Sequence, residues 1–333
     1  MGNTNSSFER MTPLVYADLM SPGYSRLKRG RGFTYLGRSG RRLSRPSIVD
    51  YCRSLVIPPA WKEVWISPQQ NAHILSTGHD QRGRKQYIYH PFWTEYRNRL
   101  KFDELHAFGK ALPSIREQVR ADLRARRLTR DRVLASVIKL LDQGLIRVGN
   151  EQYAKENGTF GATTLLEKHV TVAGAKCVNL DFRGKSGKQR AFTLGSAALA
   201  RCVRDCQELP GQRLFQYEDD SGRYPVNSSD VNDYLQHATG SDFTAKHFRT
   251  WGGSVAALEY ALEELRLGKA CTTVSAIKHT ASVLGNTPAV ARQYYVHPIV
   301  VDHIDQGALP QLTGRPRQGL SMPESAFARL LEQ

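Results

Sequence analysis

The chain has 333 residues and a formal net charge of +16, from 47 Lys and Arg against 31 Asp and Glu. This length is sufficient for two domains, and the charge favours polyanionic partners such as nucleic acid. No apolar run is long enough to span a bilayer and no signal-like segment opens the chain, so we expect no membrane association.

The amino-terminal ninety residues predict a small, basic, β-rich domain. Residues 1–30 show little periodicity and are expected to be irregular. Eight cations and no acid fall between Pro22 and Val49, and the interleaved Phe33 and Tyr35 favour a strand on a basic face. Further strands are expected at 64–66, 73–77 and 86–89, with a turn at 78–83.

After residue 92 the pattern becomes mainly helical. Residues 93–112 predict one helix, Pro113 opens a second at 115–127, and Thr129 caps a third. Short strands at 169–172, 177–182 and 190–194 precede helices near 196–208, 228–238, 244–266, 272–284, 288–295 and 323–332. Residues 307–322, rich in Gly, Pro and Gln, predict a linker.

These patterns predict an α+β fold with three segments. Residues 1–92 comprise the extension and the β-rich domain, residues 93–306 a mainly helical domain with a short β-hairpin sheet, and residues 307–333 a linker and a helix. The five cysteines (Cys52, Cys177, Cys202, Cys206 and Cys271) lack the partners for a zinc site. We expect them to be reduced core thiols in a cytosolic protein.

Residues 285–298 predict a tight turn that leads into a short helix ending in two tyrosines. Gly285 suits the left-handed end of the preceding helix, while Thr287 and Pro288 suit the start of the next. A surface helix with one packed and one exposed tyrosine would explain this stretch alone. The residues themselves leave open whether Tyr294 or Tyr295 is the functional one.

Four basic residues upstream of this stretch are further candidates for a functional site. Arg147 interrupts an apolar run, where it needs either an anion, solvent or a pair with Glu151 or Glu156. Lys185 lies at the tip of a predicted hairpin, and Lys246 and Arg249 share a helix face.

With Asn286 and one tyrosine, these cations make a set that can attack a phosphodiester. Two arginines and an amide donor would stabilise the non-bridging oxygens, a lysine would protonate the leaving oxygen, and a tyrosine would accept the phosphoryl group. No metal or other cofactor is needed for this chemistry, because the cations supply the positive charge.

Over roughly residues 50–305 the chain resembles the type IB DNA topoisomerases, in their small poxvirus and bacterial branch. The resemblance is carried by five ordered motifs: Gly83–Tyr89, Ile146–Gly161, Phe182–Lys185, Lys246–Gly252, and Gly285–Tyr295.

The resemblance implies a role for each residue. Arg147 and Arg249 match the phosphate-clamping arginines, and Lys185 matches the general acid for the 5′-hydroxyl leaving group. Tyr295, nine residues after Asn286, matches the nucleophile that forms a 3′-phosphotyrosyl link. Asn286 stands where poxvirus and eukaryotic members carry His or a related donor, and Asn matches the bacterial members; it can donate a hydrogen bond but cannot act as an acid.

The resemblance also implies a bacterial, nucleoid-associated cytoplasmic monomer that closes around double-stranded DNA as a C-shaped clamp. One strand would be cleaved, swivelled and resealed without ATP, a metal or an obligatory protein partner. The positions that match DNA contacts are Arg84, Gln86, Tyr87, Tyr89, Tyr153 and Lys246.

Two other classes of protein share parts of this pattern. A tyrosine recombinase uses the same catalytic set, but it usually carries His-x-x-Arg where this chain has Lys246, and its amino-terminal domain is helical. A non-enzymatic basic DNA-binding protein would share the charge but would not depend on Tyr295.

Overall fold

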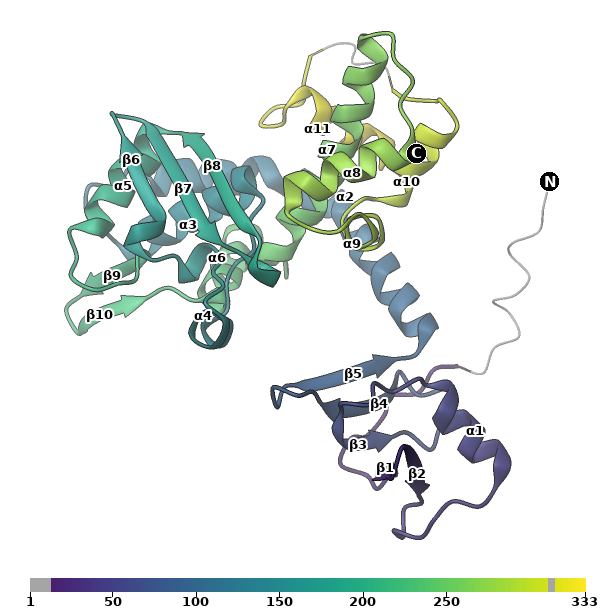
Figure 1. The fold of residues 1–333 in the computed structure, drawn as a ribbon. Helices are drawn as coiled ribbons and strands as arrows, with labels where there is room; N and C mark the ends of the chain where they lie inside the picture. The colour runs from purple at the N-terminus through teal and green to yellow at the C-terminus, as the bar shows by residue number, and fades with distance from the viewer. Residues whose placement is uncertain (1–12, 311–314) are drawn as a thin grey trace. The chain divides into compact units, whose positions relative to one another are not determined.

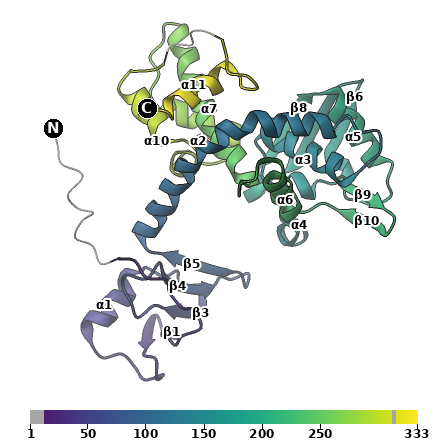
Figure 2. The same cartoon turned by 180° about the vertical axis from the view of Figure 1, so that it is seen from behind.

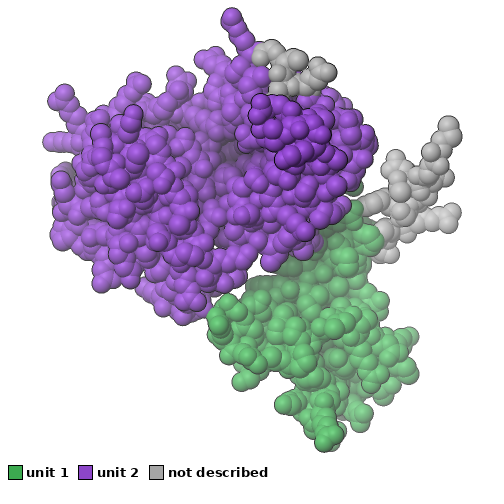
Figure 3. Space-filling view, turned by 45° about the horizontal axis from the view of Figure 1, so that its top comes forward, with its two compact units in different colours: residues 1–100 green, residues 101–333 purple. Residues whose placement is uncertain are grey.

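The computed structural model describes residues 13–310 and 315–333. The chain divides into two compact units, residues 1–100 and 101–333 (Figure 3). The boundary between them falls within one long helix, α2 (Pro91–Asp122).

Unit 1 is built on a five-stranded antiparallel sheet with the order β2-β1-β3-β4-β5 (Figure 1). Its strands are β1 (Tyr24–Arg29), β2 (Gly32–Leu36), β3 (Lys62–Ile66), β4 (Ile74–His79) and β5 (Lys85–Tyr89). Helix α1 (Pro46–Ser54) contributes Cys52 to a small core with Ile57, Val64 and Ile66. The predicted β-rich domain is therefore present.

Two features of unit 1 differ from the prediction. The expectation of an irregular segment at 1–30 is wrong for the described part, because Tyr24–Arg29 forms β1; residues 1–12 lie outside the described residues. The charged Arg26 made β1 hard to predict from the sequence. In the structure, its guanidinium donates hydrogen bonds to the carbonyls of Ile57 and Pro58 and packs on the ring of Phe33. Helix α1 was not predicted, because its first turn has no capping side chain and no acid.

Unit 2 is mainly helical and contains two small sheets. The larger sheet consists of β6 (Val170–Ala173), β7 (Cys177–Arg183) and β8 (Gln189–Gly195), and α3 (Arg130–Gly144) and α5 (Ala197–Gln207) pack against it (Figure 2). The other elements are α4 (Glu151–Asn157), β9 (Gln216–Asp219), β10 (Gly222–Pro225), α6 (Ser228–Thr239), α7 (Ala245–Arg266), α8 (Thr273–Leu284), α9 (Pro288–Tyr294), α10 (Pro298–Asp305) and α11 (Met322–Leu330).

Helix α7 lies at the centre of this unit and contacts α3, α6, α8, α10 and α11. The expected caps are present around it: Thr129 accepts a hydrogen bond at the start of α3, and Thr287 accepts one from the backbone of Val290 at the start of α9. Gly285 has the left-handed backbone, with φ of 63°, that ends α8.

One predicted helix boundary at a proline is wrong. Residues 93–127 do not form two helices, because α2 continues through Pro113. Leu105, Phe108, Leu112, Ile115 and Val119 are buried at helical spacing on both sides of the proline, so packing outweighs the lost hydrogen bond.

Helix α10 was not predicted. Pro298 opens it, and the side chain of His297 accepts a hydrogen bond from the backbone of Ile299. Helix α4 was also not predicted; it is only seven residues long and buries none of its side chains.

The carboxy-terminal helix α11 is integrated into unit 2. Ser321 and Glu324 form a capping box, and Leu320 in the preceding segment is buried. The carboxylate of Glu324 binds Arg116 at 2.7 Å and accepts a hydrogen bond from the indole of Trp251 at 3.2 Å. Helix α11 is thereby tied to both α2 and α7.

The five cysteines all lie in the described part of the chain and are unpaired. Cys52, Cys202 and Cys206 are buried as expected, whereas Cys177 and Cys271 are only partly buried. Across residues 13–310 and 315–333, no helix combines the length and apolar character needed to cross a membrane.

Candidate active site

The backbone around Tyr295 is fixed against α7. Its N–H binds the carbonyl of Ala291 at 3.0 Å, and its carbonyl accepts a hydrogen bond from the Ser254 hydroxyl at 3.3 Å. A Cβ added at Gly253 would lie 2.6 Å from the Tyr295 carbonyl oxygen and 3.1 Å from its Cβ. Only glycine at position 253 therefore permits this close approach.

The ring of Tyr295 lies between basic side chains. The Arg249 guanidinium carbon is 4.9 Å and the Lys101 Nζ 5.1 Å from the ring centroid. Burial alone would raise the pKa of Tyr295, but the charges of Arg249, Arg147 and Lys185 outweigh it and lower that pKa below the ordinary value of 10. A phenolate is therefore easier to form here than in solution.

Arg249 is held rigidly at the centre of the site. It is only 3% exposed, and its guanidinium donates to the carbonyls of Leu145, at the end of α3, and Leu284, at the end of α8. Its Nε is buried without a partner. Burial, and then repulsion by Arg147, lower its pKa to about 10. Among the described residues, no carboxylate forms a hydrogen bond or ion pair with this arginine.

Arg147 and Asn286 are joined by a hydrogen bond from the guanidinium to the Asn286 side-chain oxygen. The alternative that Arg147 pairs with an acid is not supported, because Glu151 pairs with Arg213 and Glu156 binds Gln152. Asn286 is 8% exposed, and its amide nitrogen is buried without a partner. That nitrogen is available to donate to an incoming acceptor.

A cavity of about 280 Å³ opens beside these residues. Its walls carry four cations, namely Arg147, Lys185, Lys246 and Arg249, and none of the described residues that line it is acidic. Of the two adjacent tyrosines, Tyr295 lines the cavity and Tyr294 does not. The cavity can therefore accommodate an anionic group beside the Tyr295 ring.

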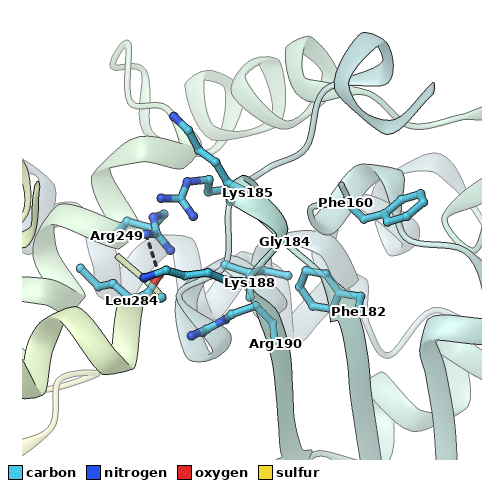
Figure 4. A pocket seen from close by; sticks show the side chains of 11 residues that line it. Phe160, Phe182, Gly184, Lys185, Lys188, Arg190, Arg249 and Leu284 are labelled. Carbon is cyan, nitrogen blue, oxygen red and sulfur yellow. Dashed lines mark hydrogen bonds between the residues drawn. The ribbon is translucent and has the colours of Figure 1, made fainter. Parts of the chain in front are cut away.

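The β7–β8 hairpin supplies further cations (Figure 4). Lys185 is exposed in the 3₁₀ turn Lys185–Gly187 at its tip, where Ser186 and Gly187 both have positive φ. Lys188 donates to the backbone carbonyl of Asn286 at 2.8 Å, and Arg190 donates to that of Val283 at 2.9 Å. The hairpin is thus attached to the turn that carries Asn286.

Three basic residues near the site were not singled out in the sequence: Lys101, Lys188 and Arg190. The glycine-flanked turn that drew attention to Lys185 also contains Lys188, which offered a signal that could have been used. Arg190 lies in a strand and Lys101 in a long polar helix, and nothing local in the sequence distinguishes either residue.

The other predicted DNA contacts fall into two groups. In unit 2, Tyr153 is 45% exposed and, like Lys246, lines the cavity. In unit 1, Tyr87 and Tyr89 are exposed on β5 and their rings stack with centroids 5.9 Å apart. The remaining two predicted contacts, Arg84 and Gln86, both bind the carboxylate of Asp80, at 2.9 Å and 3.0 Å.

Comparison with known proteins identifies the family. Residues 90–307, more than half of the chain, match the sequence model for the catalytic core of eukaryotic DNA topoisomerase I, and residues 32–80 match that for the N-terminal domain of bacterial DNA topoisomerase IB. The DNA topoisomerase 1B of Acanthamoeba polyphaga mimivirus is 32% identical over 286 residues, which cover 82% of this chain and 85% of that protein. The chain belongs to the type IB DNA topoisomerases.

More distant relatives agree with this assignment. The DNA topoisomerase 1B of vaccinia virus (strain Copenhagen) is 22% identical over 69% of this chain and 72% of its own length. The DNA topoisomerase 1 of rabbit fibroma virus (strain Kasza) is 24% identical over 71% of this chain and 74% of its own. The enzyme is therefore a type IB topoisomerase, which acts on DNA, and the recombinase alternative is set aside.

Within the described ranges, no group of three or more His, Cys, Asp or Glu residues is arranged to hold a metal ion.

Proposed function

We propose that Tyr295 attacks a phosphodiester of duplex DNA and forms a covalent 3′-phosphotyrosyl link. The observation that supports this most directly is the environment of its ring. The Arg249 guanidinium lies 4.9 Å from the centroid, beside a cavity whose described lining residues include four cations and no acid. Positive charge at this distance favours the phenolate, which is the nucleophilic form of tyrosine.

Arg147, Arg249 and Asn286 stabilise the charge that develops on the phosphate. Their positions relative to one another are set by the hydrogen bond from Arg147 to Asn286 and by the carbonyls that hold Arg249. The free amide nitrogen of Asn286 and the free Nε of Arg249 donate to the non-bridging oxygens. Donors held in this way before the reaction need little reorganisation during it.

Lys185 protonates the 5′ oxygen as it leaves. Its exposed position at the hairpin tip, on the lining of the cavity, gives the ammonium access to a strand end that has just been released. In the reverse direction, the 5′-hydroxyl attacks the phosphotyrosine and Lys185 recovers the proton. The phosphotyrosyl bond conserves the energy of the broken phosphodiester, so resealing requires no ATP.

Duplex binding extends beyond the reacting groups. In our proposal, the exposed Tyr87 and Tyr89 of unit 1 and the Tyr153 and Lys246 side chains of unit 2 contact the DNA. Phosphate contacts should dominate the affinity, which should therefore fall steeply as salt is added.

We further propose that residues 1–92 and 93–306 act as DNA-binding and catalytic domains, with 307–333 as a carboxy-terminal segment, in an enzyme that works as a monomer in the bacterial cytoplasm. Two observations are consistent with this assignment. Residues 32–80 match a bacterial N-terminal domain, and residues 90–307 match a catalytic core.

The proposal is tested by incubating supercoiled plasmid with the enzyme in EDTA and without ATP. The unmodified enzyme should relax the plasmid, and Tyr295→Phe should bind DNA but neither relax it nor form a covalent adduct. Tyr294→Phe is the matched control, because it removes the neighbouring hydroxyl outside the cavity, and it should relax DNA normally. Relaxation by Tyr295→Phe, or its loss in Tyr294→Phe alone, would overturn the assignment.

A further inference from the structure

Lys101, on α2, is a buried lysine whose amine has no partner. Only 9% of its surface is exposed, and its Nζ makes no hydrogen bond. The Nζ lies 5.1 Å from the centroid of the Tyr295 ring and 4.8 Å from that of Phe102. Burial of an unpaired ammonium is costly, so a lysine in this setting requires an explanation.

The groups that face Lys101 are basic or aromatic. Helix α7 contributes Lys246, whose charge acts on Lys101. Tyr295 follows α9, and its ring also contacts Arg249. The nearby acid Glu104, on Lys101's own helix, binds His247 at 2.9 Å. His297 packs against Phe102, and burial lowers its pKa to about 4, so it stays neutral near pH 7. Lys101 therefore lies near the positive charge of Lys246, and among the described residues no carboxylate forms a hydrogen bond with its Nζ.

This setting makes the charge of Lys101 sensitive to an added anion. Burial, and then repulsion by Lys246, lower the pKa of Lys101 to about 7. A phosphate that enters the cavity beside Lys246 and Tyr295 would favour the ammonium and raise that pKa. The added proton would come from solvent, and the negative charge of the phosphate would balance it.

We propose that Lys101 is a positioning residue for the nucleophile, and that its amine takes up a proton when a DNA phosphate enters the site. The resulting ammonium then holds the Tyr295 ring by a cation–π contact, together with Arg249. This inference rests on the proposed role of Tyr295. It adds that phosphate binding recruits a further positive charge beside the nucleophile.

Proton uptake by Lys101 makes the affinity for DNA depend on pH. Well below pH 7 the lysine is already protonated in the free enzyme, so binding takes up no proton. Above pH 7 the free amine is neutral, and each bound DNA takes up a proton as long as the complex stays protonated. The affinity for DNA should therefore fall as the pH rises. For a pKa of about 7, the loss attributable to Lys101 is about tenfold between pH 6 and pH 8.

Proton uptake can be measured by titration calorimetry in two buffers that differ in ionisation enthalpy. Full-length Tyr295→Phe is titrated with a duplex oligonucleotide, so that binding is separated from cleavage. At pH 7.5 it should take up about three quarters of a proton more than Tyr295→Phe/Lys101→Met, and at pH 6 the difference should nearly vanish. Equal uptake by the two proteins at pH 7.5 would overturn the proposal.

Two further variants separate titration from folding. Lys101→Arg keeps its charge throughout this range, so it should lose the extra proton uptake but retain tight binding at pH 8. Lys139→Met is the matched control, because burial also lowers the pKa of that lysine, but it faces Asp142 and Arg116 on another part of the unit. It should leave proton uptake unchanged. Retention of the full uptake in Lys101→Arg would contradict the proposal even if Lys101→Met did not fold.

The consequence for chemistry is tested with Tyr295 intact. At saturating DNA and pH 7.5, Lys101→Met should lower the single-turnover cleavage rate by roughly tenfold, and Lys101→Arg should recover most of it. A purely structural role would lower the melting temperature without altering proton uptake. Covalent adduct formation by Tyr295→Phe would refute the nucleophile assignment separately, because the calorimetry does not depend on cleavage.

Discussion

Gly253→Ala should displace the nucleophile Tyr295, although residue 253 itself makes no contact with DNA in our proposal. The added Cβ would lie 2.6 Å from the Tyr295 carbonyl oxygen, whereas an ordinary contact is 3.4–4 Å. The backbone of Tyr295 must therefore move by roughly 0.8 Å or more, and a 1 Å misplacement of a reacting group can cost about 10²-fold in rate. We expect the cleavage rate to fall by about 10- to 100-fold.

The assay is single-turnover cleavage of a duplex oligonucleotide at saturating enzyme, with DNA affinity measured in parallel. Affinity should change by less than about twofold, because position 253 lies behind the tyrosine within α7, while the rate falls as above. Gly195→Ala is the control, since a Cβ there would meet no atom within 4 Å, and it should cleave normally. A Gly253→Ala enzyme that cleaves as fast as the unmodified enzyme would refute the packing argument.

Three further predictions address the acid, the amide donor and the carboxy-terminal helix. Lys185→Ala should slow cleavage by about 10²- to 10⁴-fold, and a substrate with sulfur at the 5′ leaving position, which needs no proton, should restore the rate; absence of rescue would refute the acid role. Asn286→Ala should slow cleavage by about 10²- to 10³-fold through loss of an oriented donor, and Asn286→His should recover part of it; a change under threefold in Asn286→Ala would contradict this. Burial alone would raise the pKa of Glu324, but Arg116 lowers it below 4.5, so its stabilising effect is present above about pH 4.5 and lost as the pH falls. Glu324→Ala should cost about 3–5 kcal/mol of unfolding free energy at pH 7 in urea titrations and less at pH 4; an equal cost at both pH values would argue against the ion pair.

Local signals in the sequence predicted the helix ends well. Thr129, Thr287 and Gly285 have the capping roles that their residue types indicated, because a cap depends only on the few residues around it. Prolines were less informative. Pro113 lies inside α2 because the buried face continues across it, and Pro298 starts a helix as well as following one.

The sequence motifs identified most residues of the candidate site, but they did not show how these residues pack against one another. Arg147, Arg249 and Asn286 come from three separate segments, and the sequence could name them as candidates without showing that Arg147 binds Asn286. Lys101 could not be selected, because its burial and its contact with Tyr295 depend on how α2 packs against α7 and the end of α9. No local pattern encodes such a contact.

The choice between Tyr294 and Tyr295 also depends on packing that the sequence does not show. The sequence presents two adjacent tyrosines at the end of one helix and offers no physical reason to prefer either. In the structure, the Tyr295 ring lies against Arg249 and lines the cavity, and Tyr294 does not line it. The direction of a side chain at a helix end depends on the surrounding helices, so this distinction requires the fold.

The most direct test of the account is to locate the covalent bond. A nicked duplex whose short downstream fragment, which carries the released 5′-hydroxyl, dissociates after cleavage would trap the adduct, and mass spectrometry of the protease-digested product would identify the modified residue. We predict a nucleotide joined through its 3′ phosphate to Tyr295. A bond to Tyr294 or to any other side chain, or a link through a 5′ phosphate, would contradict the central claim.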